Sequence, residues 1–534
     1  MINLKLLYKI IGSLLFIETT MFLVCLGVAI GYEEEDVFTF ACSVAISATA
    51  GLTMRLLGRK CDNSLSRRDA YLVVTLTWVV FSLFGTLPFL IGGYLPSFTD
   101  AFFETMSGFT TTGASIIDDV STLPHGILFW RSFMQWIGGL GIVFFTIALL
   151  PSFVGGSVKV FAAEATGPIK TKLHPRLSTN AKWIWVVYLC ITLLCIGWLR
   201  LAGMTPFRSI NYSMATAATG GFAVDSDYSV FTPAVQYILT FFCFVSGVNF
   251  TLLYISVSKR KLSTLLKSAE CRLYLSMVLG CAAFIAFELM WKNNYALEPA
   301  VRSSLFHVVS FITSTGLLAD DPAKWAHVTW VVLAVCMFLG PCSGSTGGGF
   351  KCIRGVMLLK VIKNEFRQML HPNAVLPVKI DGVNVPQSKR VTLLAFLTSY
   401  LILCLICSFS MIAMGIDNTN AITITLSTLR HEAHYLGARD AHAAVLCAAA
   451  HLIERLVQRR YIDIGDVHRH LSDAVLVDEP SDSLRTLQRT RLHNRCTVSV
   501  AELLAGDWIA LAHRTALLSH VERNGVGAAC RRSV

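Results

Sequence analysis

Nine apolar runs of membrane-spanning length dominate this sequence. A helix needs about 20 apolar residues to cross a bilayer, and such runs lie near residues 7–32, 37–57, 70–93, 126–150, 182–204, 232–258, 272–291, 327–350 and 391–416. The chain is 54% hydrophobic and 15% charged, against about 45–50% and about 25% in ordinary soluble domains. The sequence therefore predicts an all-α polytopic membrane protein, and it excludes disorder for most of the chain.

The loops between these runs alternate between rich and poor in Lys and Arg. Basic residues gather near 55–68, 159–176, 259–272 and 351–390. By the positive-inside rule these loops are cytoplasmic, which places the N-terminus in the cytoplasm. The net charge of +11 is thereby explained without nucleic acid. The 16 Cys mostly lie within apolar runs, which favours small buried residues over disulfides or metal ligands.

Four shorter apolar stretches lie between the spanning runs. They occur near residues 98–110, 207–218, 300–312 and 419–429. Segments of about 10–14 residues are too short to span and are typical of re-entrant segments. Irregular backbone at membrane depth is tolerated only where protein buries it or where it lines a water-filled path. The loops that flank these stretches contain few Lys and Arg, which indicates that the stretches enter the membrane from the outside.

The first three short stretches each end in a Thr-Gly element. The elements are SGFTTTGAS (Ser107–Ser115), ATAATGGFA (Ala215–Ala223) and SFITSTGLLAD (Ser310–Asp320). Taking Gly113, Gly220 and Gly316 as equivalent gives separations of 107 and 96 residues. This spacing predicts one duplicated unit of helix, pore half-helix, filter strand and helix, arranged around an axis normal to the membrane.

These residue types suit a dehydrated alkali cation. Rings of backbone carbonyls replace the water around the ion in potassium channels, glycine permits the backbone conformation that aligns successive carbonyls, and threonine adds a hydroxyl. A single Thr-Gly turn is usually structural, but three at a repeat spacing favour an ion filter. The predicted filter residues are Thr110, Thr111, Thr112, Gly113, Thr219, Gly220, Ser314, Thr315 and Gly316.

Residues 1–429 resemble the TrkH/KtrB family of bacterial potassium transporters, and TrkH more closely. The similarity rests on Thr99–Ser115, Phe129–Pro151, Leu201–Ile210, Thr219–Phe222 and Cys342–Arg354. It implies two N-terminal helices followed by four repeats around one pore, in a homodimer with a cytoplasmic nucleotide-binding subunit of the TrkA/KtrA type. It implies no enzyme activity and no cofactor, with K⁺ as the transported ion.

The resemblance divides the chain into six segments. They are an N-terminal helix pair (1–60), pore repeats (61–160, 161–262 and 263–372), an incomplete fourth repeat (373–429) and an atypical tail (430–534). The third repeat contains a predicted intramembrane gating loop at 340–351.

The Gly-rich part of that loop cannot hold a regular helix well. It consists of Gly344, Ser345, Thr346, Gly347, Gly348 and Gly349. The family implies a gate below the filter, with a plain helix kink as the alternative. A nucleotide-binding loop has the wrong spacing for G-x-x-x-x-G-K-[ST]. We expect Lys351 and Arg354 to anchor the loop or to contact a regulatory subunit.

Four further polar residues lie in or near the apolar runs. Glu18 and Glu288 are functional candidates because intramembrane carboxylates are rare, but each can also satisfy a neighbouring helix. Glu104 either holds the first half-helix or attracts cations to the outer mouth. We expect Arg131 to pair with a loop carboxylate such as Asp118 or Asp119.

The composition changes abruptly after residue 429. Residues 430–534 contain 14 Arg, no Lys and 9 of the 14 His, whereas residues 1–429 contain 17 Lys and 14 Arg. The fourth filter and the last helix of the family are not recognisable, because the chain continues RHEAHYLGARD (Arg430–Asp440). Three explanations stay open: a frameshift or mis-joined gene end, a soluble C-terminal domain, and a diverged working pore. We interpret His431, His434, His468 and His470 as surface residues rather than zinc ligands.

Two functions are compatible with this sequence. The first is K⁺ uptake through a carbonyl-lined filter that the Gly-rich loop gates. The alternative is a non-transporting membrane protein that lacks a complete pore, because an absent filter strand leaves the ion partly unsolvated.

Overall fold

The computed structural model describes residues 3–59, 67–117, 119–141, 177–226, 231–261, 263–373 and 376–413, with single positions from 415 to 426. The chain divides into units of residues 1–458 and 459–534, and everything described belongs to the first. The predictions for residues 430–534, including the four histidines, therefore lie outside the described residues.

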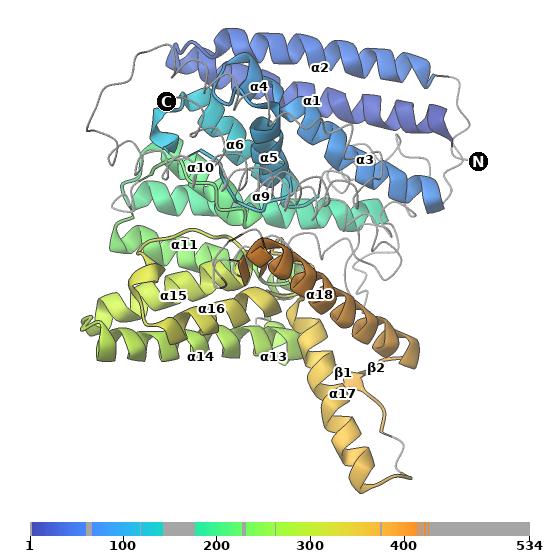
Figure 1. Ribbon diagram of the computed structural model, residues 1–534, viewed down its shortest axis with the longest axis vertical. Helices are drawn as coiled ribbons and strands as arrows, with labels where there is room; N and C mark the ends of the chain where they lie inside the picture. The colour runs from blue at the N-terminus through green and yellow to red at the C-terminus, as the bar shows by residue number, and fades with distance from the viewer. Residues whose placement is uncertain are drawn as a thin grey trace, which may run out of the picture. The chain divides into compact units, whose positions relative to one another are not determined.

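The regular secondary structure of the described residues is helical apart from one short hairpin (Figure 1). The N-terminal half contains α1 (Leu4–Tyr32), α2 (Val37–Leu57), α3 (Arg67–Gly85), α4 (Leu87–Ile91), α5 (Phe98–Phe109), α6 (His125–Gly138), α9 (Leu177–Leu201) and α10 (Pro206–Ala218). The second half contains α11 (Pro233–Ser246), α12 (Phe250–Ser258), α13 (Ser263–Lys267), α14 (Ala269–Lys292), α15 (Leu297–Thr313), α16 (His327–Leu339), α17 (Cys352–Leu370), β1 (Lys379–Ile380), β2 (Val383–Asn384) and α18 (Gln387–Ala413). The prediction of an all-α fold is confirmed.

One order of elements occurs three times. A long helix, a short helix, an irregular strand and a second helix follow one another in α3–α5–α6, in α9–α10–α11 and in α14–α15–α16. The short helices α5, α10 and α15 fall on the predicted re-entrant stretches. Helix α6 packs against α10, and α11 packs against α15, so the second helix of one repeat contacts the short helix of the next. Of the fourth stretch, near 419–429, the structure describes residues 421, 422, 425 and 426.

The second helix of each repeat stops at a glycine. Gly139, Gly247 and Gly340 are the C-cap residues of α6, α11 and α16. The prediction of one continuous span over 232–258 is wrong, because α11 and α12 meet at 98°. The Asn249 side chain accepts hydrogen bonds from Thr251 N and Leu252 N, so it starts α12 as a new helix.

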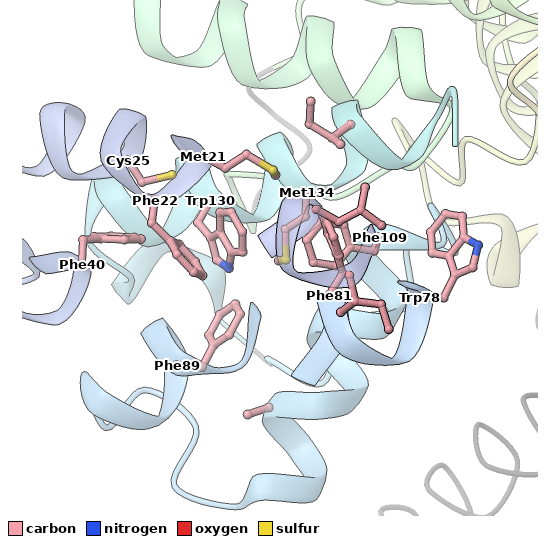
Figure 2. Close-up of a cluster of buried hydrophobic side chains, with 14 of the residues drawn as sticks. Met21, Phe22, Cys25, Phe40, Trp78, Phe81, Phe89, Phe109, Trp130 and Met134 are labelled. Atoms are coloured by element: carbon pink, nitrogen blue, oxygen red, sulfur yellow. The ribbon is translucent and has the colours of Figure 1, made fainter. Parts of the chain in front are cut away.

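An apolar cluster fixes the end of α5 (Figure 2). The Phe109 ring lies 5.6 Å from the Phe81 ring of α3 and 5.9 Å from the Trp130 ring of α6, edge-on in both cases. The indole of Trp130 also donates to Gly85 O over 3.2 Å. Because aromatic pairs have specific preferred geometries, this cluster fixes the position of Phe109, which directly precedes the first Thr-Gly element.

Candidate functional site: three Thr-Gly turns above a Gly-rich loop

The three short helices end in one common backbone turn. The first residue of each turn is left-handed, and so is the glycine two positions later. The φ angles are 54° and 76° for Thr111 and Gly113, 53° and 77° for Thr219 and Gly221, and 63° and 75° for Ser314 and Gly316. The residue between them donates its N–H to the carbonyl five positions back, over 2.9 Å in all three turns: Thr112 to Ser107, Gly220 to Ala215 and Thr315 to Ser310.

These shared angles and hydrogen bonds shift the equivalent glycine of the second turn by one residue from the one predicted. The sequence spacing predicts Gly220 as the equivalent of Gly113 and Gly316, but the glycine with positive φ is Gly221. The Thr-Gly-Gly sequence contains two adjacent glycines, and the spacing alone could not choose between them. The hydrogen bond from Gly220 N settles the choice, because it places Gly220 in register with Thr112 and Thr315.

Successive turns pack directly on one another through these glycines. A Cβ atom at Gly113 would lie 2.0 Å from Gly220 O, and one at Gly221 would lie 1.6 Å from Thr315 O. Turn one therefore contacts turn two, and turn two contacts turn three, backbone against backbone. At Gly316 no atom within the described part of the chain lies within 4 Å of the corresponding position.

Hydroxyl groups accompany two of the turns. Thr110 Oγ1 lies 2.8 Å from Thr112 Oγ1, and Thr313 Oγ1 lies 2.8 Å from Thr315 Oγ1. The second turn has Ala218 where the others have Thr110 and Thr313, so it lacks this pair.

Gln135 of α6 binds the backbone of the second turn through two hydrogen bonds. Its Nε2 donates to Gly220 O over 2.8 Å, and its Oε1 accepts from Phe222 N over 3.0 Å. The side chain is fully buried. Gln135 is not among the predicted site residues, although a glutamine inside the apolar run Phe129–Pro151 is a signal that could have indicated it.

A buried ion pair joins the segments that follow the first two turns. Arg131 Nε lies 2.8 Å from Glu104 Oε1, and both side chains are at most 1% exposed. The other guanidinium nitrogens donate to Ala223 O and Ser115 Oγ, each over 3.0 Å. The described partner of Arg131 is Glu104 of α5, so the expected pairing with Asp119 is wrong. Asp118 lies outside the described residues, and Asp119 bonds to the hydroxyls of Ser121 and Ser226, which lower the pKa of its carboxyl.

The Gly-rich loop lies against the C-terminal ends of two short helices. Gly348 N donates to Ser314 Oγ over 2.8 Å, and Thr346 Oγ1 donates to Ala217 O over 3.0 Å. A Cβ atom at Gly347 would lie 2.5 Å from Thr313 O. The loop therefore touches the C-terminal ends of α10 and α15, immediately beside the turns.

The same loop pairs with the break between α11 and α12. Cys342 N donates to Gly247 O, and Phe250 N donates to Gly344 O, each over 3.0 Å. Two irregular segments thus satisfy each other's backbone groups, as buried backbone requires. Ser345 Oγ donates to Cys342 O within the loop, and Gly349 has φ of 92°.

The two basic residues after the loop face different partners. Lys351 is 1% exposed, and its Nζ donates to Gly347 O. The guanidinium of Arg354 lies 4.1 Å from the Phe396 ring of α18, and it donates to Phe350 O over 3.3 Å.

The other intramembrane carboxylates have simpler surroundings. Glu288 Oε2 lies 3.1 Å from Lys292 Nζ, one turn along the same helix. Glu18 is fully buried and makes no hydrogen bond to the described residues. No group of three His, Cys, Asp or Glu able to hold a metal occurs within the described ranges.

Comparison with known proteins agrees with this geometry. The family model for the TrkH cation transport proteins matches residues 35–428. The chain belongs to the TrkH family. Relatives include the Trk system potassium uptake protein TrkH of Escherichia coli strain K12, which is 32% identical over 80% of this chain and 90% of its own length. TrkH of Halomonas elongata is 32% identical over 82% of this chain and 92% of its own length.

The crystal structure of the potassium transporter TrkH from Vibrio parahaemolyticus has the same fold as this TrkH-family chain. The TM-score is 0.73 at 30% identity, over 85% of this chain and 96% of that one. The resemblance drawn from the sequence motifs is therefore confirmed, and the chain is a multi-pass membrane protein of a cation transport family.

Proposed function

We propose that this chain takes up K⁺ across the cytoplasmic membrane. The observation that carries the proposal is the contact of three equivalent turns through Gly113 and Gly221. Close backbone packing of this kind can present a row of carbonyl oxygens to a dehydrated cation. The proposed ligands are the carbonyls of Thr110, Thr111, Thr112, Gly113, Thr219, Gly220, Ser314, Thr315 and Gly316, to which the corrected register adds Gly221.

The Gly-rich loop is the proposed gate. Its residues, Gly344 to Gly349, contact the ends of α10 and α15, so an ion that leaves the turns would meet this loop next. Membrane potential can drive the cation inward, at about 2.3 kcal/mol per charge per 100 mV. Lys351 and Arg354 hold the end of the loop in this proposal.

The remaining proposals follow from the family. They are a homodimer, a cytoplasmic nucleotide-binding regulatory subunit of the TrkA/KtrA type, a cytoplasmic N-terminus and a cell inner membrane location. The division of residues 1–372 into a helix pair and three pore repeats belongs with them. The Trk relatives are named as potassium uptake proteins, which supports K⁺ as the ion.

The non-transporting alternative rests on the sequence after residue 429, where the fourth filter of the family is not recognisable. A cation with one side unliganded loses several kcal/mol of solvation, roughly the cost of burying an uncompensated charge.

K⁺-limited growth tests the proposal. A bacterium that lacks its own potassium uptake systems is expected to grow at limiting K⁺ when it expresses this chain, and to fail with Gly113→Ser, because that side chain would strike Gly220 O. Membrane abundance of each protein is measured by immunoblot. An abundant chain that gives no growth would support the non-transporting alternative.

A further inference from the structure

Glu270 is a buried carboxylate at the start of α14, beside the Gly-rich loop. It is the second residue of α14 and is 4% exposed. Its Oε1 accepts a hydrogen bond from Ser343 N over 2.5 Å and another from Ile353 N over 3.1 Å. These two N–H groups stand on opposite sides of the Gly-rich loop, so one oxygen atom ties both ends of that loop to α14.

Hydrogen-bond donors of the Gly-rich loop and a nearby ammonium group compensate Glu270 for its burial. A buried carboxylate is tolerated only where hydrogen bonds and opposite charge compensate for lost water, and here two N–H groups and the Lys351 ammonium act on Glu270. Lys351 in turn donates to Gly347 O, within the loop. The carboxylate and the ammonium therefore hold the ends and the middle of the same segment.

The start of α14 is itself held by the hairpin between α17 and α18. Asp381, at the hairpin turn, accepts from Ala269 N over 2.9 Å and lies 3.4 Å from Ser268 Oγ. Lys360 of α17 donates to Lys379 O of β1 over 2.6 Å. A chain of direct contacts thus runs from α17 through the hairpin to Glu270 and the loop.

We propose that Glu270 is a positioning residue that latches the Gly-rich loop against the C-terminal ends of α10 and α15. The latch holds whether or not the loop gates K⁺. Its effect on transport rests on the proposed function, in which releasing the loop opens the path.

Alkylation of the native Cys342 tests the latch. Cys342 is fully buried and directly precedes Ser343, whose N–H binds Glu270. In Glu270→Ala both N–H groups lose their acceptor, so we expect the rate of Cys342 alkylation by N-ethylmaleimide in membranes to rise about tenfold or more. The modified peptide is quantified by mass spectrometry. Cys25, fully buried in α1, reports global unfolding in the same sample and is expected to stay unchanged.

Two further variants sharpen the test. Glu270→Gln keeps an acceptor oxygen and loses the charge, so its rate is expected between those of Glu270→Ala and the parent chain. Glu288→Ala removes a carboxylate from the other end of α14 and is expected to match the parent. If Glu270→Ala does not reach the membrane, the comparison of Glu270→Gln with Glu288→Gln carries the test, and equal rates overturn the latch.

The other outcomes are also decisive. An unchanged Cys342 rate in Glu270→Ala overturns the proposal, as does a parallel rise at Cys342 and Cys25. Uptake of ⁸⁶Rb⁺ is measured in the same cells, and faster basal uptake in Glu270→Ala supports the latch as part of a gate. A selective rise at Cys342 with no uptake by any variant would retain the latch and contradict the proposed function.

Discussion

Replacing Gly221 with alanine is expected to lower the initial rate of ⁸⁶Rb⁺ uptake at least about tenfold, the consequence of two effects at one atom. The backbone at Gly221 has φ of 77°, a conformation that costs an L-residue about 1–2 kcal/mol. The added methyl would also lie 1.6 Å from Thr315 O, which no relaxation of a side chain can relieve. The second and third turns must separate, and the carbonyl oxygens between them move away from their positions around the ion.

Two other glycines make matched controls for Gly221→Ala. Gly93 has φ of 70° and Gly316 has φ of 75°, and no described atom lies within 4 Å of either Cβ position. Gly93→Ala carries only the backbone strain, in a loop before α5, and is expected to retain uptake. Gly316→Ala carries the same strain in the third turn and is expected to fall between the two. Equal uptake in Gly221→Ala and Gly93→Ala would contradict the close packing of the turns.

Five of the nine predicted spans have a described helix of spanning length, in α1, α2, α9, α14 and α18. These helices and the short helices were predictable because they depend on local composition. Bilayer thickness sets the length of an apolar run, and α5, α10 and α15 lie where short runs interrupt the long ones. The turns were predictable as Thr-Gly elements for a similar reason. The register of the second turn was not, because Gly220 and Gly221 are chemically identical and differ only in the tertiary contact that each backbone makes.

The supporting residues could not be predicted because their partners are distant in sequence. Gln135 meets Gly220, Glu270 meets Ser343, and Arg131 meets Ala223 only once the repeats have packed. The sequence suggests nearby loop acids as partners of Arg131, whereas its described partner is Glu104 of α5, 27 residues before it. The break between α11 and α12 was hidden by the apolar residues on both sides of Gly247.

Removing the carboxylate of the buried pair is expected to destabilise the protein strongly. Glu104→Leu leaves the guanidinium of Arg131 at 1% exposure without its counter-charge. Breaking a buried pair from one side typically costs about 3–5 kcal/mol. Glu104→Leu should therefore lower the temperature at which half of the detergent-solubilised protein has unfolded. This temperature is measured by fluorescence-detected size-exclusion chromatography after heating. Glu298→Gln disrupts the pair between Glu298, 56% exposed, and Arg302, and as a surface change it should cost only about 0–1 kcal/mol.

The double variant Glu104→Leu with Arg131→Met separates stability from positioning. It removes the unpaired charge as well, so part of the stability lost in Glu104→Leu is expected to return. The contact of Glu104 with Ile116 N, which holds the strand after the first turn, is still absent. The contact of Arg131 with Ala223 O, which reaches the segment after the second turn, is absent too. Uptake of ⁸⁶Rb⁺ is therefore expected to stay low in a protein that is folded again. Recovery of uptake together with stability would mean that the pair only fills space beside the turns.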